Sequence, residues 1–187
     1  MREDIINYLK EEVYSRAIRP ENKFGIGAYY HIEAVVKNGE LLAEQYGADK
    51  DVVIIAAWLH DIASITDYSL YEMHHIHGAE IAEELLKKFN YDLGKINLIK
   101  NCIINHRGSI ELKKITIEER CVADADAISH FDSIPNLLYL SYVKKNMGIE
   151  EGKEFVKAKL QRSYQKLSEE SKKYYLQKYK NAMELLG

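Results

Sequence analysis

The sequence predicts an all-α protein, and three observations carry this prediction. Apolar residues recur every three or four positions through most of the 187 residues, which is the spacing of amphipathic helices. Only two prolines, Pro20 and Pro135, interrupt the chain. No segment shows the alternation of a convincing strand. With 47% hydrophobic residues, the chain can bury one core, so a single compact domain over residues 1–187 is expected.

Each helix follows from its own apolar face and its own stop signal. The first ends before Pro20, and the second ends at Gly47, a typical C-terminal residue. Residues 21–27 and 62–71 are expected as connections. Thr116 and Glu119 have the spacing of a capping box at the start of a helix. The predicted helices cover residues 3–19, 28–46, 52–59, 72–89 and 95–105, one helix from Thr116 onward, and two or three helices within 134–187.

The third helix is apolar on every side and ends at His60-Asp61. The eight apolar residues 52–59 predict a segment that is buried all round. An imidazole and a carboxylate at the end of such a segment cost several kcal/mol if they stay unpaired. A divalent cation would satisfy both groups. A hydrogen-bonded His-Asp pair in the core is the plainer alternative.

Other histidines and acids lie at inward positions of separate helices. His31 lies one turn before an apolar residue of the second helix, and His106 continues the apolar stripe of the fifth. In the helix 72–89 the stripe Ile81, Leu85 and Phe89 extends back to His77, with His74 one turn earlier, whereas His75 is expected to face solvent. Asp124 and Asp126 are about 200° apart on a helix, so only one of them can face a shared site.

These side chains predict a metal centre in the core of a helical bundle. The two cysteines, Cys102 and Cys121, lie far apart and form no CxxC pair, so a structural zinc site of the cysteine type is not expected. Four to six nitrogen and oxygen ligands suit one or two ions of Mn, Fe, Co, Ni or Zn, and Mg less well.

In this order, the residues resemble the HD-domain superfamily of metal-dependent phosphohydrolases. The resemblance spans residues 27–132 and implies an HD-like helical bundle, followed by a helical extension over 133–187 to which no function is given. It assigns a first metal to His31, His60, Asp61 and Asp126, because 125–128 reads Ala-Asp-Ala-Ile, close to the family's Ala-Asp-x-Leu. Asp124 is the reserve.

The resemblance also implies a second metal. Its ligands would be His77 and His106, with Asp61 bridging the two ions. Many relatives have an Arg before the first His, where this chain has Tyr30, so contacts to phosphate are expected from elsewhere.

The expected activity is hydrolysis of a phosphate ester or anhydride in a small molecule, a nucleotide above all, by metal-activated water. Asp61 takes part as a ligand, Asp67 is the candidate acid or base in the loop after it, and Arg107 is the candidate phosphate contact. Three alternatives stay open: a phosphodiesterase for cyclic nucleotides or dinucleotides, a metal-stabilised regulatory or binding module without turnover, and an oxygenase with a diiron site.

The charge balance limits the expected partners. The net charge of −3, with 26 basic and 29 acidic residues, does not favour a nucleic-acid polymer. The N-terminal residues are charged and no apolar run is long enough to cross a bilayer, so a cytoplasmic protein without membrane contact is expected. Assembly into a homo-oligomer is left open.

Overall fold

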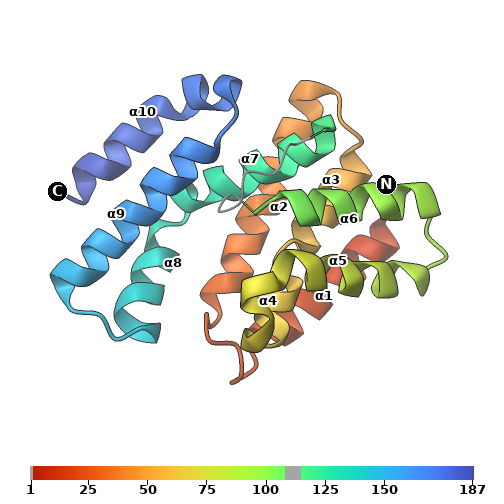
Figure 1. The fold of residues 1–187 in the computed structure, drawn as a ribbon, viewed down its shortest axis with the longest axis horizontal. Helices are drawn as coiled ribbons and strands as arrows, with labels where there is room; N and C mark the ends of the chain where they lie inside the picture. The colour runs from red at the N-terminus through yellow and green to blue at the C-terminus, as the bar shows by residue number, and fades with distance from the viewer. Residues whose placement is uncertain (1, 108–114) are drawn as a thin grey trace.

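The computed structural model describes residues 2–107 and 115–187, and within these residues all regular secondary structure is helical. The all-α prediction is confirmed (Figure 1). The elements are α1 (Glu3–Ala17), α2 (Gly27–Tyr46), α3 (Lys50–Leu59), α4 (Ile62–Thr66), the 3₁₀ helix η1 (Tyr68–Met73), α5 (His74–Lys87), α6 (Leu93–Asn105), α7 (Ile117–Asp132), α8 (Ile134–Tyr139), the π-helical turn η2 (Leu140–Lys144), α9 (Ile149–Lys166) and α10 (Glu169–Leu185).

Helix α3 is the central helix of the bundle. The side chains from Val52 to Leu59 are all buried, and α3 packs against α1, α2, α6 and α7. The helix begins at Asp49, whose carboxylate accepts hydrogen bonds from the backbone N–H groups of Asp51 and Val52. Burial of these apolar side chains contributes about 1.5–3 kcal/mol for each large one, so the end of α3 is held rigidly in the interior.

The chain turns sharply after α3, and this turn positions His60 and Asp61. His60 is the C-cap of α3 and Asp61 is the N-cap of α4, so the two residues lie in the junction between helices. The expected connection over residues 62–71 is instead α4 and η1. Helix α5 approaches this junction closely at Gly78, where an added Cβ would lie 3.5 Å from the backbone oxygen of His60.

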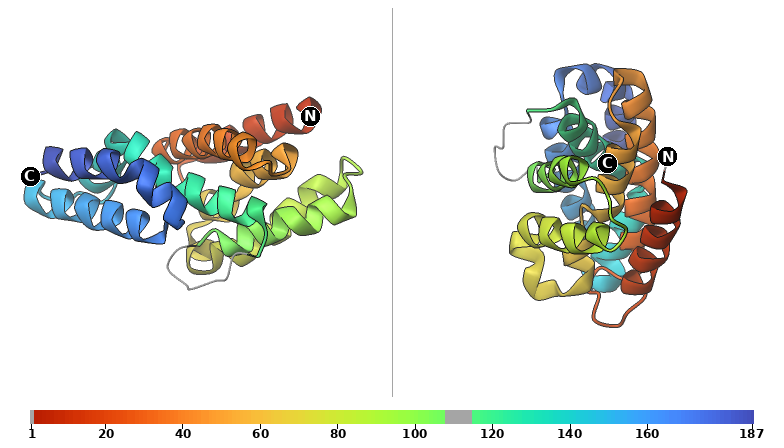
Figure 2. Two further views of the ribbon diagram at one scale, coloured as in Figure 1. Left: turned by 90° about the horizontal axis from the view of Figure 1, so that it is seen from above. Right: turned by 90° about the vertical axis from the view of Figure 1, so that its right-hand side faces the viewer.

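The last two helices form the end of the molecule opposite the N-terminus (Figures 1 and 2). Helix α9 packs against both α7 and α10, and its Val156 and Leu160 are fully buried. The expected extension is therefore docked on the bundle, although Tyr174 and Leu185 on α10 remain exposed. None of the described helices combines the length and the apolarity that a membrane crossing requires.

Candidate metal centre

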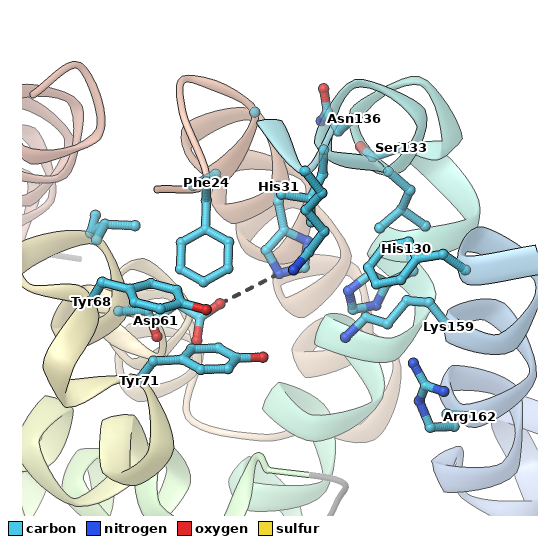
Figure 3. A pocket seen from close by; sticks show the side chains of 18 residues that line it. Phe24, His31, Asp61, Tyr68, Tyr71, His130, Ser133, Asn136, Lys159 and Arg162 are labelled. Carbon is cyan, nitrogen blue, oxygen red and sulfur yellow. Dashed lines mark ion pairs between the residues drawn. The ribbon is translucent and has the colours of Figure 1, made fainter. Parts of the chain in front are cut away.

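Imidazoles and carboxylates from five parts of the fold converge next to the end of α3. They are His31 from α2, His60 and Asp61 from the α3–α4 junction, His74 from the start of α5, His106 from the end of α6, and Asp126 and His130 from α7. Within three overlapping groups of these residues, the potential ligand atoms lie within 4.8 Å of one another. Figure 3 shows His31 and Asp61 facing each other at the centre of this region, with His130 beside them.

The carboxylate of Asp61 lies at the centre of the cluster. Its Oδ2 atom is 3.4 Å from His60 Nε2 and 3.9 Å from His31 Nε2. Its Oδ1 atom is 3.5 Å from His74 Nε2 and 3.9 Å from His106 Nε2. Each oxygen therefore faces its own pair of imidazoles, which is the arrangement expected of a carboxylate that bridges two ions.

The surroundings keep Asp61 ionised. Burial alone would raise the pKa of its carboxyl, but the neighbouring His60, His74 and His106 hold that pKa well below its usual range. Burial and the adjacent His60 lower the pKa of His106 to about 3. Burial disfavours the charged form of His60, but the adjacent Asp61 carboxylate raises the pKa of this imidazole. Metal ligation requires the imidazoles to be neutral and the carboxylate to be ionised.

Backbone carbonyls orient three of the four imidazoles that face Asp61. The Nδ1 atoms of His60, His74 and His106 lie 2.8, 2.7 and 2.5 Å from the carbonyl oxygens of residues 57, 71 and 103, each three positions earlier. A carbonyl oxygen can only accept, so Nδ1 carries the proton in each case. The Nε2 atom is thereby directed toward Asp61, as in histidine ligands whose other nitrogen is held by the surrounding protein.

His31 is oriented by a side chain rather than by a carbonyl. Its Nδ1 lies 3.0 Å from Ser129 Oγ, and this hydroxyl donates to the backbone oxygen of Asp126 at 2.7 Å. The hydroxyl has one proton, so it accepts from His31 Nδ1–H. The Nε2 atom of His31 faces both Asp61 and Asp126.

This donor set fits a divalent cation. Imidazole nitrogens and ionised carboxylate oxygens are both ligands of divalent cations, and they face each other here within a few ångströms. His60 Nε2 is fully buried and has no hydrogen-bond partner. His31, His60 and Asp61 would hold a first ion, next to a group of His31, Asp126 and His130, and Asp61, His74 and His106 would hold a second ion. Imidazole and carboxylate together suit Mn, Fe, Co, Ni or Zn.

The structure separates the roles of the two acids on α7. Asp126 Oδ1 lies 3.3 Å from His31 Nε2, so this residue lies in the cluster. Asp124 is 1% exposed and points away, where it accepts hydrogen bonds from Ser168 N, Ser168 Oγ and Ser171 Oγ. The reserve residue Asp124 thus fastens the start of α10.

The prediction that His77 points inward is wrong. Its side chain is 39% exposed and its Nδ1 lies 3.2 Å from Glu80 on the surface of α5. His74 is the residue that faces Asp61, and His75, expected in solvent, is 4% exposed. The buried face of α5 includes the small residues Gly78, Ala79 and Ala82, which gave no strong apolar signal, whereas the stripe used for the prediction included the half-buried Ile81.

Asp67 and Arg107 have other partners in the structure. Asp67 is exposed and caps η1, where its carboxylate accepts a hydrogen bond of 2.8 Å from Ser69 N. Arg107 donates to the backbone oxygen of Glu72, and its guanidinium lies 3.8 Å from the carboxylate of the same residue. Among the described residues, neither of them lines the pocket next to the cluster.

That pocket has a volume of 310 Å³ and two chemically different sides. Phe24, Tyr68 and Tyr71 form one side, with the rings of Tyr68 and Tyr71 stacked at 5.6 Å. Lys159 and Arg162 from α9 lie on the other side, as Figure 3 shows, and His31 and Asp61 lie between the two. Lys145 also lines the pocket, with its Nζ 5.6 Å from the ring centroid of Phe155.

Sequence reasoning missed His130 and the basic residues of α9. His130 is four residues after Asp126 and hence on the same face of α7, a spacing that could have indicated it. Its Nδ1 lies 3.9 Å from Asp126 Oδ1 and 3.2 Å from Ser163 Oγ of α9. Lys159 and Arg162 gave no local signal, because nothing in the sequence indicates where α9 docks.

The fold and the donor set define the class of the protein, an all-helical protein with a candidate divalent-metal centre. The chain matches the HD domain family over residues 28–130, more than half of its length. The chain therefore belongs to the HD domain family, as its motifs predicted.

Proteins that match in sequence do so over a little more than half of this chain. An uncharacterised protein of Clostridium beijerinckii is 30% identical over 106 residues, which are 56% of this chain and 66% of the relative. Ribonuclease Y of Mycoplasma mycoides subsp. mycoides is 35% identical over 106 residues, 57% of this chain. The match spans 19% of that ribonuclease, so most of the relative has no counterpart in it.

Solved structures share the whole fold. Bacillus subtilis YpgQ, solved in complex with ADP, has a TM-score of 0.68 and 16% identity over 97% of this chain and 93% of that chain. A predicted HD superfamily hydrolase from an uncultured Thermotogales bacterium has a TM-score of 0.57 and 20% identity over 100% of this chain and 93% of that chain. At these identities the similarity shows the fold alone.

Proposed function

We propose that the protein hydrolyses a phosphate ester or anhydride of a small molecule, a nucleotide above all. The observation that carries this proposal is the convergence of four imidazole Nε2 atoms on Asp61 beside a pocket that α9 lines with cations. Small-molecule sites have volumes of about 300–1,000 Å³, so the pocket of 310 Å³ suits a compact ligand.

The metal would supply an activated water and neutralise phosphate charge. The protein's own side chains and backbone orient the ligands and would hold the metal in place. Backbone carbonyls and Ser129 fix the four imidazoles, and Asp61 presents one oxygen to each pair of imidazoles. Phosphoryl transfer depends mainly on such positioning and on charge stabilisation, which this cluster is built to provide.

The two sides of the pocket support a nucleotide as substrate. Lys159 and Arg162 line the pocket, where their side chains can reach phosphate oxygens. Burial lowers the pKa of the Lys159 ammonium, and a phosphate anion beside it would favour its charged form. The rings of Phe24, Tyr68 and Tyr71 offer faces on which a planar base can stack. The complex of the structural neighbour YpgQ with ADP is consistent with this ligand class.

The match to ribonuclease Y favours a second candidate, hydrolysis of a phosphodiester such as a cyclic nucleotide or dinucleotide. The two candidates use the same cluster and differ in the bond that is cleaved. A screen that measures phosphate, pyrophosphate and nucleoside monophosphate as separate products distinguishes them.

The test is that screen, run on nucleotides and cyclic nucleotides with Mn²⁺, Fe²⁺, Co²⁺, Ni²⁺, Zn²⁺ and Mg²⁺ in turn. Asp61→Asn keeps the side-chain shape and removes the charge shared by both metal positions, so activity falls at least about 100-fold. Asp67→Asn is the matched control and retains activity. If Asp61→Asn keeps both bound metal and hydrolysis, the site is misassigned. Bound metal that raises the melting temperature without any turnover would identify a binding module instead.

A further inference from the structure

Helix α9 lies outside the residues that match the HD domain family, yet it reaches the candidate metal centre. Lys159, Arg162 and Lys166 are spaced by three and four residues, so they share one face of α9. The buried Val156 and Leu160 and the packing against α7 fix the helix in place. Lys159 and Arg162 line the pocket, whereas Lys166 has a different partner.

Lys166 forms an ion pair with the last predicted metal ligand. Its Nζ donates a hydrogen bond to Asp126 Oδ2. The other oxygen, Oδ1, faces His31 Nε2 at 3.3 Å and His130 Nδ1 at 3.9 Å. The two oxygens of Asp126 are thus divided between a lysine on one side and imidazoles on the other.

This pairing is enclosed by protein. The side chains of Lys166 and Asp126 are 15% and 9% exposed, so water screens their attraction less than it would on the surface. Lys166 is the last residue of α9, where the negative end of the helix dipole also favours a cation. The ammonium group is therefore held beside Asp126 rather than free to leave it.

We propose that Lys166 is a positioning residue of the site. By pairing with one oxygen of Asp126, Lys166 leaves only the other oxygen for the metal. Its positive charge also makes the site more favourable for anionic substrates. The proposal rests on the proposed function, because it assumes that the site binds a metal ion and a phosphate group. It concerns a residue outside the HD motif and assigns part of the active site to the C-terminal helices.

The charges around the site predict that removal of Lys166 changes the affinities for cations and for phosphate in opposite directions. Asp61 and Asp126 contribute two negative charges, and Lys166 offsets one of them. Its removal makes the site more negative and frees Asp126 Oδ2, so a cation binds more tightly while a phosphate anion binds more weakly. Loss of mere structural support would weaken both.

The experiment measures the two affinities separately on the full chain. Mn²⁺ binding to the metal-free protein is followed by isothermal titration calorimetry, and binding of inorganic phosphate is then measured at saturating Mn²⁺. For Lys166→Met we expect Mn²⁺ affinity to rise about tenfold and phosphate affinity to fall about tenfold. Lys166→Gln removes the charge but keeps a hydrogen-bond donor for Asp126, so it covers the case in which the methionine variant does not fold.

Two control variants complete the design. Lys166→Arg keeps the charge and is expected to stay near the wild-type values. Lys157→Met removes a lysine of the same helix that pairs with Glu154, and both affinities are expected to stay unchanged. Parallel losses of Mn²⁺ and phosphate affinity in the Lys166 variants, or no change in either, would overturn the proposal.

The failure of this proposal can be told from the failure of the proposed function. Wild-type protein that binds no divalent ion refutes the metal site itself, whatever the Lys166 variants do. Wild-type protein that binds Mn²⁺ and hydrolyses phosphate compounds, with Lys166→Met and Lys166→Gln indistinguishable from it, refutes only the role of Lys166.

Discussion

Substitution of Asp124 and Asp126 separates fold stability from metal binding on a single helix. Asp124→Ala leaves three donors without their acceptor, namely Ser168 N, Ser168 Oγ and Ser171 Oγ. Hydrogen bonds to a charged group contribute about 1.5–3 kcal/mol each, and the hydroxyls can partly recover by rotating. We therefore expect the free energy of unfolding to fall by about 3–6 kcal/mol.

A loss of that size is easily measured. For a chain of this length about 1 kcal/mol corresponds to 2–4 °C, so the melting temperature of Asp124→Ala should fall by roughly 10–20 °C in differential scanning calorimetry. Asp124→Asn keeps one acceptor oxygen and should lose less. At a temperature where the protein is folded, Asp124→Ala should keep its Mn²⁺ affinity within about twofold, since Asp124 faces away from the cluster.

Asp126→Asn is expected to have the opposite effect to Asp124→Ala, since it changes metal binding. It removes the charge that faces His31 and Lys166, so Mn²⁺ affinity should fall at least about 100-fold. If folded Asp124→Ala loses Mn²⁺ binding while Asp126→Asn retains it, the assignment of the two acids is reversed and the reasoning from the structure fails.

Three further outcomes are expected. His74→Gln weakens Mn²⁺ binding about 10- to 100-fold by calorimetry, whereas His77→Gln leaves it unchanged; equal effects would contradict the inward face of α5. In the metal-free protein, burial lowers the pKa of His106 to about 3, against an ordinary pKa of 6.5. Between pH 6.5 and 3 the unfolded chain therefore binds more protons than the folded chain, so a fall in pH through this range lowers the free energy of unfolding. His106→Gln should flatten this pH dependence in urea unfolding, and an unaltered slope would refute it. Lys159→Met should raise the KM for a hydrolysed nucleotide about tenfold with Lys157→Met as the neutral control, and an unchanged KM would remove Lys159 from the phosphate site.

The centre of the fold could be predicted from the sequence because its signals are local. The apolar run before His60-Asp61 indicates a buried helix by itself, and the structure buries every side chain from Val52 to Leu59. His31 and His106 each continue an apolar stripe of their own helix, so their inward direction followed from helical periodicity. The choice of Asp126 over Asp124 came from the family motif, since periodicity alone states only that one of the two is inward.

The parts that could not be predicted depend on contacts between distant segments. The inward face of α5 includes His74, His75 and Gly78, and Gly78 lies against the end of α3, whereas the stripe used for the prediction extends from Leu85 to the exposed His77. The basic residues of α9 reach the site because α9 docks on α7, which no pattern within residues 133–187 reveals. Long-range packing, rather than helix propensity, decided both cases.

The measurement that tests the central claim most directly is anomalous diffraction from crystals grown with Mn²⁺. We expect an anomalous peak within bonding distance of Asp61, with His31, His60 and Asp126 as the further ligands of the ion. A second peak between Asp61, His74 and His106 is compatible with this site. A fully occupied Mn²⁺ bound elsewhere, or the absence of a peak at Asp61 at saturating Mn²⁺, would contradict it.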